Sequence, residues 1–286
     1  MSFQIITDTC CDFPTPMYAQ LDLVCVPLVV NFRGQTTEDK NDDSLKILYS
    51  ALRSGEVATT SAVNPECWKQ AMEGSLREGK DVLVLVFSSG LSTTYQSACI
   101  AAQDLQESYP DRKIVVIDTL SASMGQGLLV WYACKHRDAG ESLEQVAAWV
   151  EENKLHLCHW FTVDDLMYLK RGGRISAATA VVGSMLQIKP VLHMDDEGHL
   201  INMAKARGRR ASLDAIAKKI RELGEGYDNS TVFISHGDCL EDAKYLERQF
   251  KEKYGVKDVI ISYVGPVIGS HSGPGTMAVF FLGKHR

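Results

Sequence analysis

The sequence lacks features that would place it in several other classes of protein. It has no basic excess, since 30 lysines and arginines stand against 36 aspartates and glutamates, so we do not expect a nucleic-acid-binding surface. No apolar run has the length of a membrane span, and the first residues lack the pattern of a signal peptide. The 8 cysteines include no C-x-x-C pair, and most fall in apolar segments. We therefore expect a reduced, cytoplasmic protein.

Motifs for nucleotide binding and for serine hydrolysis are also missing. There is no G-x-x-x-x-G-K-[ST] phosphate loop. The pair Gly125 and Gly127 supplies only the first half of a dinucleotide fingerprint, and close helix–sheet packing explains it more simply. In residues 269–273 the central position holds histidine, where a nucleophile elbow has serine. The chain therefore shows no sequence signature of a kinase or of an α/β-hydrolase.

A metal site is not expected either. His156 and His159 flank Cys158 in a predicted strand. Side chains three positions apart in a strand face opposite sides of the sheet, so the two imidazoles do not converge on one ion.

The first half of the chain has the pattern of a parallel α/β sheet. At 286 residues and 45% hydrophobic content, the chain can form one large or two medium domains. Near-continuous apolar strands that alternate with helices indicate a sheet covered on both faces. We predict strands at residues 3–7, 23–31, 82–87 and 114–117, and helices at 43–53, 65–78, 93–108 and 124–137. Residues 1–153 are thus predicted to form an N-terminal α/β/α domain with a mainly parallel sheet.

The second half reads as an α+β domain with mixed strands, spanning residues 154–286. An acidic turn at 195–198 joins two short strands and indicates an antiparallel hairpin. No repeat, low-complexity tract or flexible linker is visible, so the two domains should pack firmly. We predict helices at 142–152, 210–223 and 241–254, strands at 155–163, 231–235, 259–264 and 277–282, and hairpin strands at 190–194 and 199–205.

Polar turns next to predicted core elements are candidates for a ligand site. They lie at residues 7–12, 58–61 and 87–94. In open α/β sheets the ligand crevice lies beyond the carboxyl ends of the strands, where hydroxyls and free amides suit a carboxylate or a phosphate. For any one of these turns, ordinary helix capping by Ser or Thr is the better explanation, and only their combination with the His271 segment favours a site. The candidate hydroxyls are those of Thr60, Ser61, Ser89 and Ser92.

Two further segments are candidates for the same site. Residues 269–276 hold His271 between two serines, with three glycines and a proline, just before an apolar strand. Glycines such as Gly273 allow close backbone approach, and a histidine can donate a hydrogen bond to an anion, although an ordinary surface turn fits as well. Residues 168–176 form a basic turn in which a helix C-cap accounts for Gly172 but leaves Arg174 available for a carboxylate or phosphate.

Taken together, these segments resemble the DegV family of fatty-acid-binding proteins over nearly the whole chain. Each motif is short, but their order and spacing are specific. They are Thr7-Asp8-Thr9, Thr60-Ser61 with Pro65, Ser88-Ser89-Gly90-Leu91-Ser92, Asp118-Thr119 with Gly125-Gln126-Gly127, Asp165-Leu166 through Gly172-Gly173-Arg174-Ile175, Ile188-Lys189-Pro190, and His271-Ser272-Gly273-Pro274-Gly275.

The resemblance implies a carrier rather than an enzyme. Proteins of this family hold a long-chain fatty acid, need no cofactor, and act as the lipid-carrying subunit of a bacterial fatty acid kinase. A separate ATP-binding subunit phosphorylates the bound carboxylate, and transient membrane contact is compatible with that role. Carried over by motif, the carboxylate contacts fall on Thr60 or Ser61, Ser92 or Ser89, and His271, while Arg174 resembles the family's basic residue near the head group.

The resemblance also implies an apolar tunnel for the acyl chain within the C-terminal domain. Candidate lining residues are the small-residue segment 177–188, Val191, Phe233, Ile234, Val267 and Ile268. The chain departs from the family pattern at Thr9 and Cys10, where serines are common, and at Thr93, where a glycine is usual. A β-branched residue after Ser92 restricts the backbone of that loop.

One alternative function stays open at this point. An independent esterase or acyl hydrolase would use Ser92 or Ser89 as nucleophile with His271 as base, although no acid of a triad is identifiable from spacing.

Overall fold

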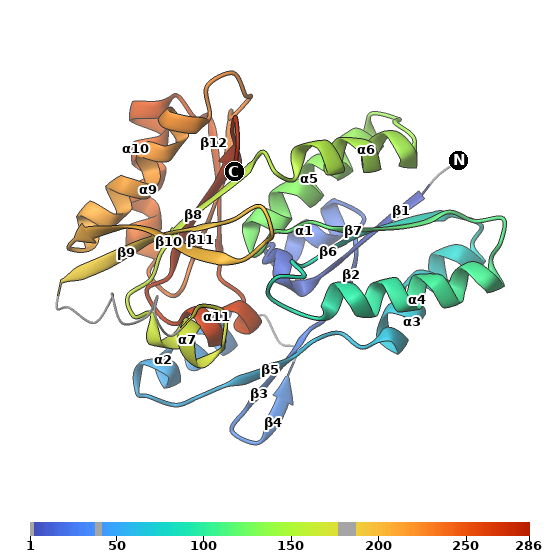
Figure 1. Cartoon of the computed structure of the whole chain (residues 1–286), viewed down its shortest axis with the longest axis horizontal. Coiled ribbons are helices and arrows are strands. Elements are labelled where there is room, and N and C mark those ends of the chain that lie inside the picture. Colours follow the sequence, from blue (N-terminus) through green and yellow to red (C-terminus); the bar gives the residue numbers. More distant parts are fainter. Residues whose placement is uncertain (1–2, 38–41, 177–186) are drawn as a thin grey trace.

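The first half of the chain forms a parallel sheet with helices on both faces. The computed structural model describes residues 3–37, 42–176 and 187–286, and every structural statement below concerns those residues. The sheet has the order β2-β1-β6-β7 with all neighbours parallel, which confirms the predicted architecture. Its elements are β1 (Phe3–Asp8), β2 (Val24–Val26), β6 (Asp81–Val86) and β7 (Ile114–Asp118), with α3 (Pro65–Arg77) and α4 (Thr94–Ser108) on one face and α5 (Met124–Asp138) and α6 (Leu143–Asn153) on the other (Figure 1).

Local sequence chemistry accounts for these elements. Every residue of β1 and β6 is buried, as their continuous apolar runs require of central strands. The side chain of Asn64 accepts a hydrogen bond from the backbone N–H of Cys67, and Pro65 fills the first helical position of α3. Ser142 and Gln145 form a capping box that starts α6.

The second half forms a six-stranded mixed sheet in the order β10-β9-β8-β13-β11-β12. Only β11 and β12 pair in parallel, and β9 and β10 form the predicted hairpin. Helices α9 and α10 cover one face, and α5 from the first half packs on the other. The elements are β8 (Leu157–Thr162), α7 (Met167–Arg171), β9 (Ile188–Met194), β10 (Leu200–Arg207), α9 (Arg209–Leu223), β11 (Thr231–His236), α10 (Leu240–Tyr254), β12 (Asp258–Tyr263), α11 (Pro266–Ser272) and β13 (Met277–Leu282).

A small third sheet was not predicted. Residues 23–31, predicted as one strand, form β2 and β3 in different sheets, because Pro27 has no N–H to donate and interrupts the ladder. The predicted polar turn at 58–61 is largely a strand, β5. This antiparallel sheet has the order β4-β3-β5 and consists of β3 (Val29–Phe32), β4 (Gln35–Thr37) and β5 (Thr59–Ser61); the 3-10 helix η1 (Thr9–Cys11) and helices α1 (Thr15–Gln20) and α2 (Asp42–Arg53) complete the first half.

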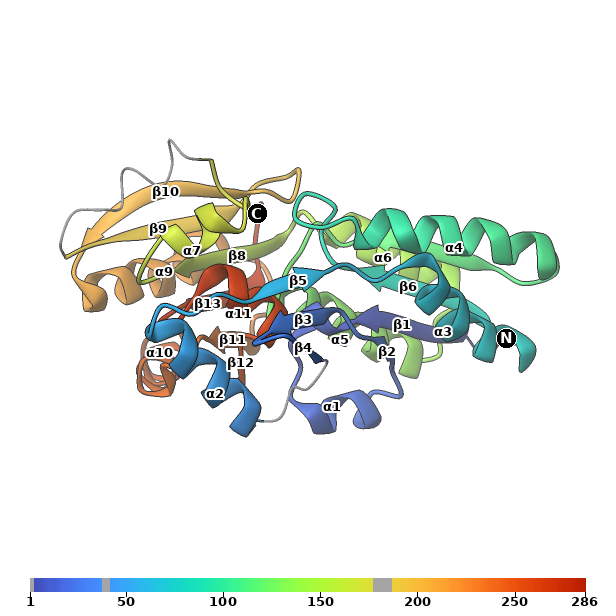
Figure 2. The same ribbon diagram turned by 90° about the horizontal axis from the view of Figure 1, so that it is seen from below.

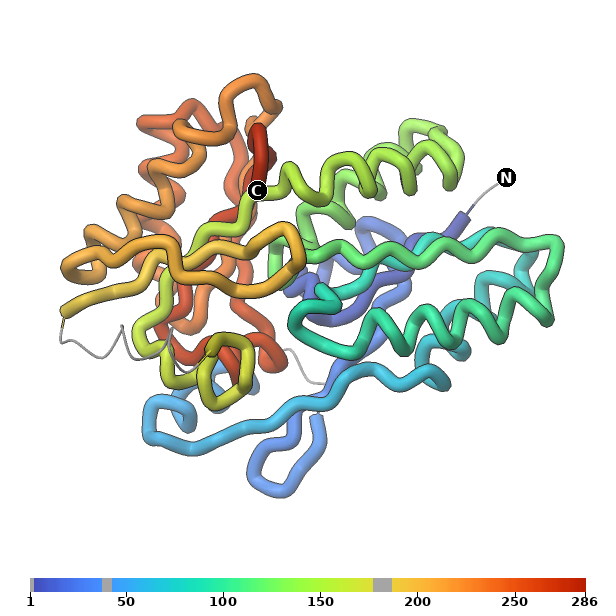
Figure 3. The backbone as a smooth tube through the Cα atoms, viewed as in Figure 1, coloured from blue at the N-terminus to red at the C-terminus, as the bar shows by residue number. Residues whose placement is uncertain are grey.

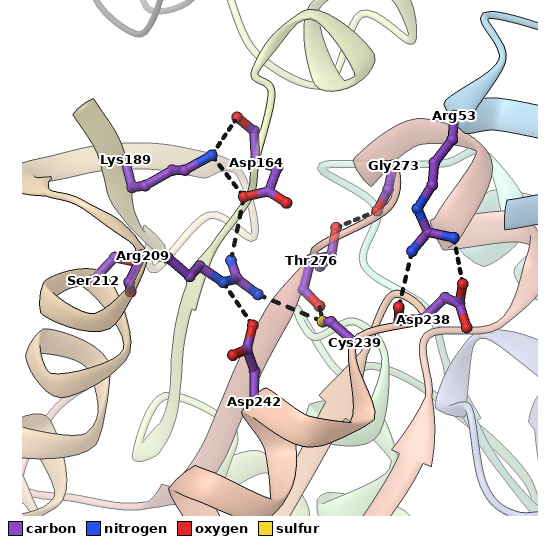
Figure 4. A network of polar contacts seen from close by, with 10 residues as sticks. All are labelled: Arg53, Asp164, Lys189, Arg209, Ser212, Asp238, Cys239, Asp242, Gly273 and Thr276. Atoms are coloured by element: carbon purple, nitrogen blue, oxygen red, sulfur yellow. Dashed lines mark hydrogen bonds and ion pairs between the residues drawn. The ribbon is translucent and has the colours of Figure 1, made fainter. Parts of the chain in front are cut away.

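The two halves are joined by direct contacts. Helix α2 lies against α11 of the second half (Figure 2), where the Tyr49 hydroxyl donates to the Val264 carbonyl at 2.7 Å. Arg53 pairs with Asp238 (Figure 4). The turn between β9 and β10 reaches the loop after β6 (Figure 3), where the Ser88 hydroxyl donates to the Gly198 carbonyl at 2.9 Å. The division at residue 153 remains a prediction. No helix in the described part of the chain combines the length and apolarity needed to cross a membrane.

Candidate functional site

A cavity of about 460 Å³ lies between the two halves of the molecule. Its walls come from β5, the loop after β6, the start of α5, the ends of β8 and β13, α7, and α11. No aspartate or glutamate is among the described residues that line it. The apolar part of the wall consists of Leu28, Ala62, Phe87, Leu91, Ala122, Phe161, Leu169, Met194, Leu200, Val264, Val267, Ile268, Ala278 and Phe280.

Helix α11 supplies one face of the cavity. The prediction of a loop over residues 269–276 is wrong for its first half, because Pro266 begins a helix that continues to Ser272. Val267, Ile268, His271 and Ser272 line the cavity together. Their spacing of one, three and one residues places them on one side of a helix, so α11 aims its only titratable side chain at the cavity.

A histidine–threonine pair forms the centre of the polar wall. His271 Nε2 lies 2.7 Å from Thr60 Oγ1, and Ser61 lines the cavity next to Thr60 on β5. Burial, together with the nearby positive charge of Arg174, lowers the pKa of His271 to about 4. The imidazole is therefore neutral at pH 7 and carries one N–H.

The loop after β6 contributes two serines. Ser89 and Ser92 both line the cavity, and Ser92 Oγ lies 2.8 Å from Thr94 Oγ1 at the start of α4. The backbone N–H of Ser89 donates to Asp118 Oδ1 at 3.2 Å. A Cβ added to Gly90 would lie 2.7 Å from the Gly198 carbonyl oxygen, so the loop is pressed against the β9–β10 turn. These contacts hold the loop in place; Ser92 Oγ also accepts from the Thr94 backbone N–H at 3.3 Å, whereas only the backbone N–H of Ser89 is engaged in its bond to Asp118.

Arg174 supplies the positive charge of the cavity. It follows α7, and its guanidinium donates to the Leu91 and Gly172 carbonyls, so it touches both halves. Burial lowers the pKa of this guanidinium, which is ordinarily far above neutral, so the group stays charged at pH 7. Among the described residues no carboxylate forms an ion pair with it, and an anion from outside the chain would supply the missing negative charge.

Gly273 does not reach the cavity wall. It ends α11 with φ 79°, and its carbonyl accepts a hydrogen bond from Thr276 Oγ1 at 2.7 Å (Figure 4). A Cβ at this position would lie 2.5 Å from Cδ2 of the Tyr168 ring. The structure therefore gives Gly273 a packing role and brings together the other six candidates, Thr60, Ser61, Ser89, Ser92, Arg174 and His271, around one cavity.

The predicted tunnel lining is largely wrong within the described residues. Val267 and Ile268 line the cavity, but Val191 and Ile234 pack on the opposite face of the six-stranded sheet, beneath α9 and α10. Phe233 packs against Phe13 and Trp131. Most of the small-residue segment 177–188 lies outside the described residues.

Three polar residues of the cavity were missed from the sequence. They are Ser123 at the start of α5, His159 on β8 and Ser235 on β11. Alternation along β8 places His159 on the same face as Phe161, and that pattern could have identified it. No group of three or more histidines, cysteines, aspartates or glutamates in the described ranges could hold a metal ion.

The arrangement suits an anion with an apolar tail. One cation, two neutral imidazoles and several hydroxyls face a common space that is otherwise apolar and has no competing acidic side chain among its described residues. Hydroxyl and guanidinium donors stabilise a buried carboxylate, which is costly to bury unpaired.

Comparisons with known proteins agree with this picture. A family model described as "Uncharacterised protein, DegV family" matches residues 2–284. A DegV domain-containing protein from Clostridium perfringens is 46% identical over 286 residues, covering 99% of this chain and 98% of its own length. A solved DegV family protein from Thermus thermophilus, described by its fatty acid binding, is 32% identical with a TM-score of 0.87, over 99% of this chain and 100% of its own. A stearic acid-binding protein from Eubacterium ventriosum is 25% identical with a TM-score of 0.87, over 99% of this chain and 98% of its own.

Proposed function

The chain belongs to the DegV family, and from that premise we propose that it binds a long-chain fatty acid and presents the carboxylate to a separate ATP-dependent kinase subunit. The observation that carries this proposal is the cavity between the halves. It combines an apolar wall with Arg174, His271 and hydroxyls, and its described lining contains no acidic side chain.

The polar wall accounts for the carboxylate. Thr60 and His271 are paired at 2.7 Å, and when Nε2 donates to Thr60 the hydroxyl hydrogen of Thr60 remains for a ligand oxygen. Ser92, Ser89 and Ser61 provide further hydroxyls on the same cavity. Several donors are needed, because a carboxylate that leaves water with too few partners is strongly destabilised.

The apolar wall accounts for the acyl chain. Phe161, Phe280 and Leu169 are among the side chains that face the cavity, and each buried methylene of a ligand contributes about 0.8 kcal/mol. A long alkyl chain therefore gains affinity in proportion to its buried length, which supports a long-chain acid over acetate-sized anions.

The kinase partner is proposed from the family resemblance and from what the chain lacks. Phosphoryl transfer from ATP calls for positioned phosphates and bound magnesium, and the sequence contains no phosphate loop. Arg174 lies beside His271 and is half-buried, where it can stabilise the charge of a developing acyl phosphate. A cytoplasmic location and transient contact with a membrane belong to the same proposal.

The geometry does not favour a serine hydrolase. A nucleophilic serine needs a base within hydrogen-bond reach. In the described residues His271 Nε2 pairs with Thr60, and Ser92 Oγ pairs with Thr94, with no hydrogen bond between His271 and either Ser89 or Ser92.

Two measurements test the proposal. Native mass spectrometry of the purified protein should detect a co-purifying carboxylic acid of about 14 to 18 carbons, a length expected from the family. The isolated chain should not convert ATP and fatty acid to acyl phosphate. Acyl phosphate should form once the separate ATP-dependent kinase subunit is added. If the isolated chain hydrolyses a long-chain ester and S92A or S89A abolishes that activity, the protein is an esterase and the proposed carrier function is wrong.

A further inference from the structure

The same cavity contains a second polar region, formed by Ser123, His159 and Ser235, that the carboxylate site does not use. All three side chains are buried, with exposures of 6%, 3% and 0%. The pKa of His159 is lowered by burial and by Arg286 and His193, whereas Arg174 acts on His271. The two histidines therefore have different surroundings within one cavity.

His159 presents a ring nitrogen, Nδ1, that has no hydrogen-bond partner among the described residues. Its Nε2 lies 3.0 Å from Ser121 Oγ, and that oxygen also accepts from the Arg286 guanidinium at 3.3 Å. A guanidinium can only donate, so the Ser121 hydrogen is available for Nε2, and in that arrangement the single proton of the neutral ring sits on Nδ1. In the other tautomer Nε2 donates to Ser121 and Nδ1 is an acceptor, and a ligand hydroxyl can pair with Nδ1 in either case. No described residue lies within hydrogen-bond distance of Nδ1.

Ser235 presents a hydroxyl to the same region. Ser123 Oγ lies 2.6 Å from Asp12 Oδ2 and 2.9 Å from Ser235 Oγ, and Ser123 is the donor in both contacts. Ser235 therefore accepts from Ser123, and its own hydrogen has no acceptor among the described residues. Because Ser235 lines the cavity, a ligand hydroxyl can accept that hydrogen.

The backbone beside this region has an unusual conformation and a closely packed glycine. Ser123 has φ 54° and ψ −147°, an unfavourable conformation for a residue with a side chain, at the start of α5. This conformation accompanies the short bond between Ser123 and Asp12 across 111 residues of sequence. Gly125 leaves room for the His159 ring, because a Cβ there would collide with it.

We propose that the cavity selects a fatty acid that carries a hydroxyl group within its chain, with the hydroxyl oxygen hydrogen-bonded to His159 or Ser235. This inference rests on the proposed function. An unsubstituted chain would leave Nδ1 of His159 and the hydrogen of Ser235 unpaired beside Phe161 and Phe280. A site built to pair with a hydroxyl discriminates against the ligand that lacks it.

The test compares octadecanoic acid with its monohydroxy isomers on delipidated protein, by displacement of a fluorescent fatty acid. At least one isomer should bind about 3- to 10-fold more tightly than octadecanoic acid, the range of one ordinary hydrogen bond. The ratio should fall to about 1 or below in the variant S235A or H159L that removes its partner, and H159Q, which keeps an N–H donor, should retain part of it.

The matched control is T162V. Thr162 lies on the same strand as His159 and is equally buried, but it does not line the cavity, so the ratio should not change. If octadecanoic acid binds as tightly as every isomer, or if a preference survives in both S235A and H159L, the inference is wrong while the carrier function stands. If neither acid binds to the wild-type protein, the proposed function itself fails.

Discussion

His271 is the residue whose charge decides how the site receives an anion. Its pKa of about 4 makes it neutral at pH 7, so Arg174 alone supplies positive charge and His271 contributes a hydrogen bond. NMR titration of the ligand-free protein should find this imidazole titrating near 4, with H271N identifying its resonance. A midpoint near the ordinary value of about 6.5 would mean that the ring is solvated or paired with an acid.

The same lowered pKa predicts a pH dependence of stability. The unfolded chain binds a proton at His271 near pH 6.5 and the folded chain only near 4, so this residue makes stability fall as the pH drops through that range. Between pH 7 and pH 5 the loss from His271 is up to about 2 kcal/mol. Urea unfolding at both pH values should show a smaller loss for H271N than for the wild-type protein; equal losses would contradict the prediction.

Thr60 offers a direct test of the carboxylate contacts. T60V keeps the shape of the side chain but removes the hydroxyl that pairs with His271, so the Kd for octadecanoic acid should rise about tenfold or more. T59V is the control, because Thr59 is exposed, precedes Thr60 on β5 and does not line the cavity. Isothermal titration calorimetry measures the Kd of both variants for octadecanoic acid. Similar Kd values for T60V and T59V would mean that the Thr60 hydroxyl does not contact the carboxylate.

At the scale of elements, the sequence was informative where periodicity was strong. The buried runs of β1 and β6 and the capped starts of α3 and α6 were predictable, because burial and capping leave local signatures. The strand β5 was not, since it has only three residues, all polar, of which two are exposed, and it pairs only with β3. This strand, β5, is the element that places Thr60 within hydrogen-bond distance of His271.

Helix α11 shows why the polar loop was misjudged. Its seven residues include glycine and serine, which argue against a helix by propensity, yet contacts with α2 and α7 hold it in place. The polar groups of Ser123, His159 and Ser235 escaped prediction for a related reason. They meet only when strands β8 and β11 and the start of α5 come together, and no sequence spacing encodes that.

The end of α11 leads to a prediction about packing. G273A should destabilise the fold, because position 273 has φ 79° and its added Cβ would press on the Tyr168 ring. G140A is the matched control, with φ 90° and no atom within 4 Å of the added Cβ. Urea unfolding should show G273A to be less stable than G140A by about 1 kcal/mol or more. Equal values would mean that Tyr168 moves aside freely.

At the scale of the whole molecule, the ligand should act as a link between the halves. Thr60 and Ser92 belong to the first half, His271 and Arg174 to the second, and bonds such as Ser88 to Gly198 already join them. A ligand at about 100 times its Kd stabilises the folded state by about 2.7 kcal/mol. Calorimetry should therefore show one transition that moves upward with octadecanoic acid. If calorimetry shows two unfolding transitions and octadecanoic acid raises the temperature of only one, the ligand binds to one half alone.

Arg174 connects ligand binding to the partner that the proposed function requires. Its guanidinium donates to the carbonyls of Leu91 in the first half and Gly172 in the second, and it lines the cavity. Most of the affinity for a long-chain acid should come from the apolar wall and not from Arg174. We therefore expect R174A to raise the Kd for octadecanoic acid only a few-fold, since Arg174 is half-buried and a solvent-screened ion pair is worth about 1 kcal/mol or less. Acyl-phosphate formation with the kinase subunit should fall far more, by about 100-fold, because a fixed donor lost from a developing charge costs about 3 kcal/mol. R174K, which keeps the charge but not the planar fork, should recover binding and only part of the rate. Equal losses of binding and rate in R174A would make Arg174 a carboxylate ligand and leave the phosphoryl-transfer step to groups on the partner.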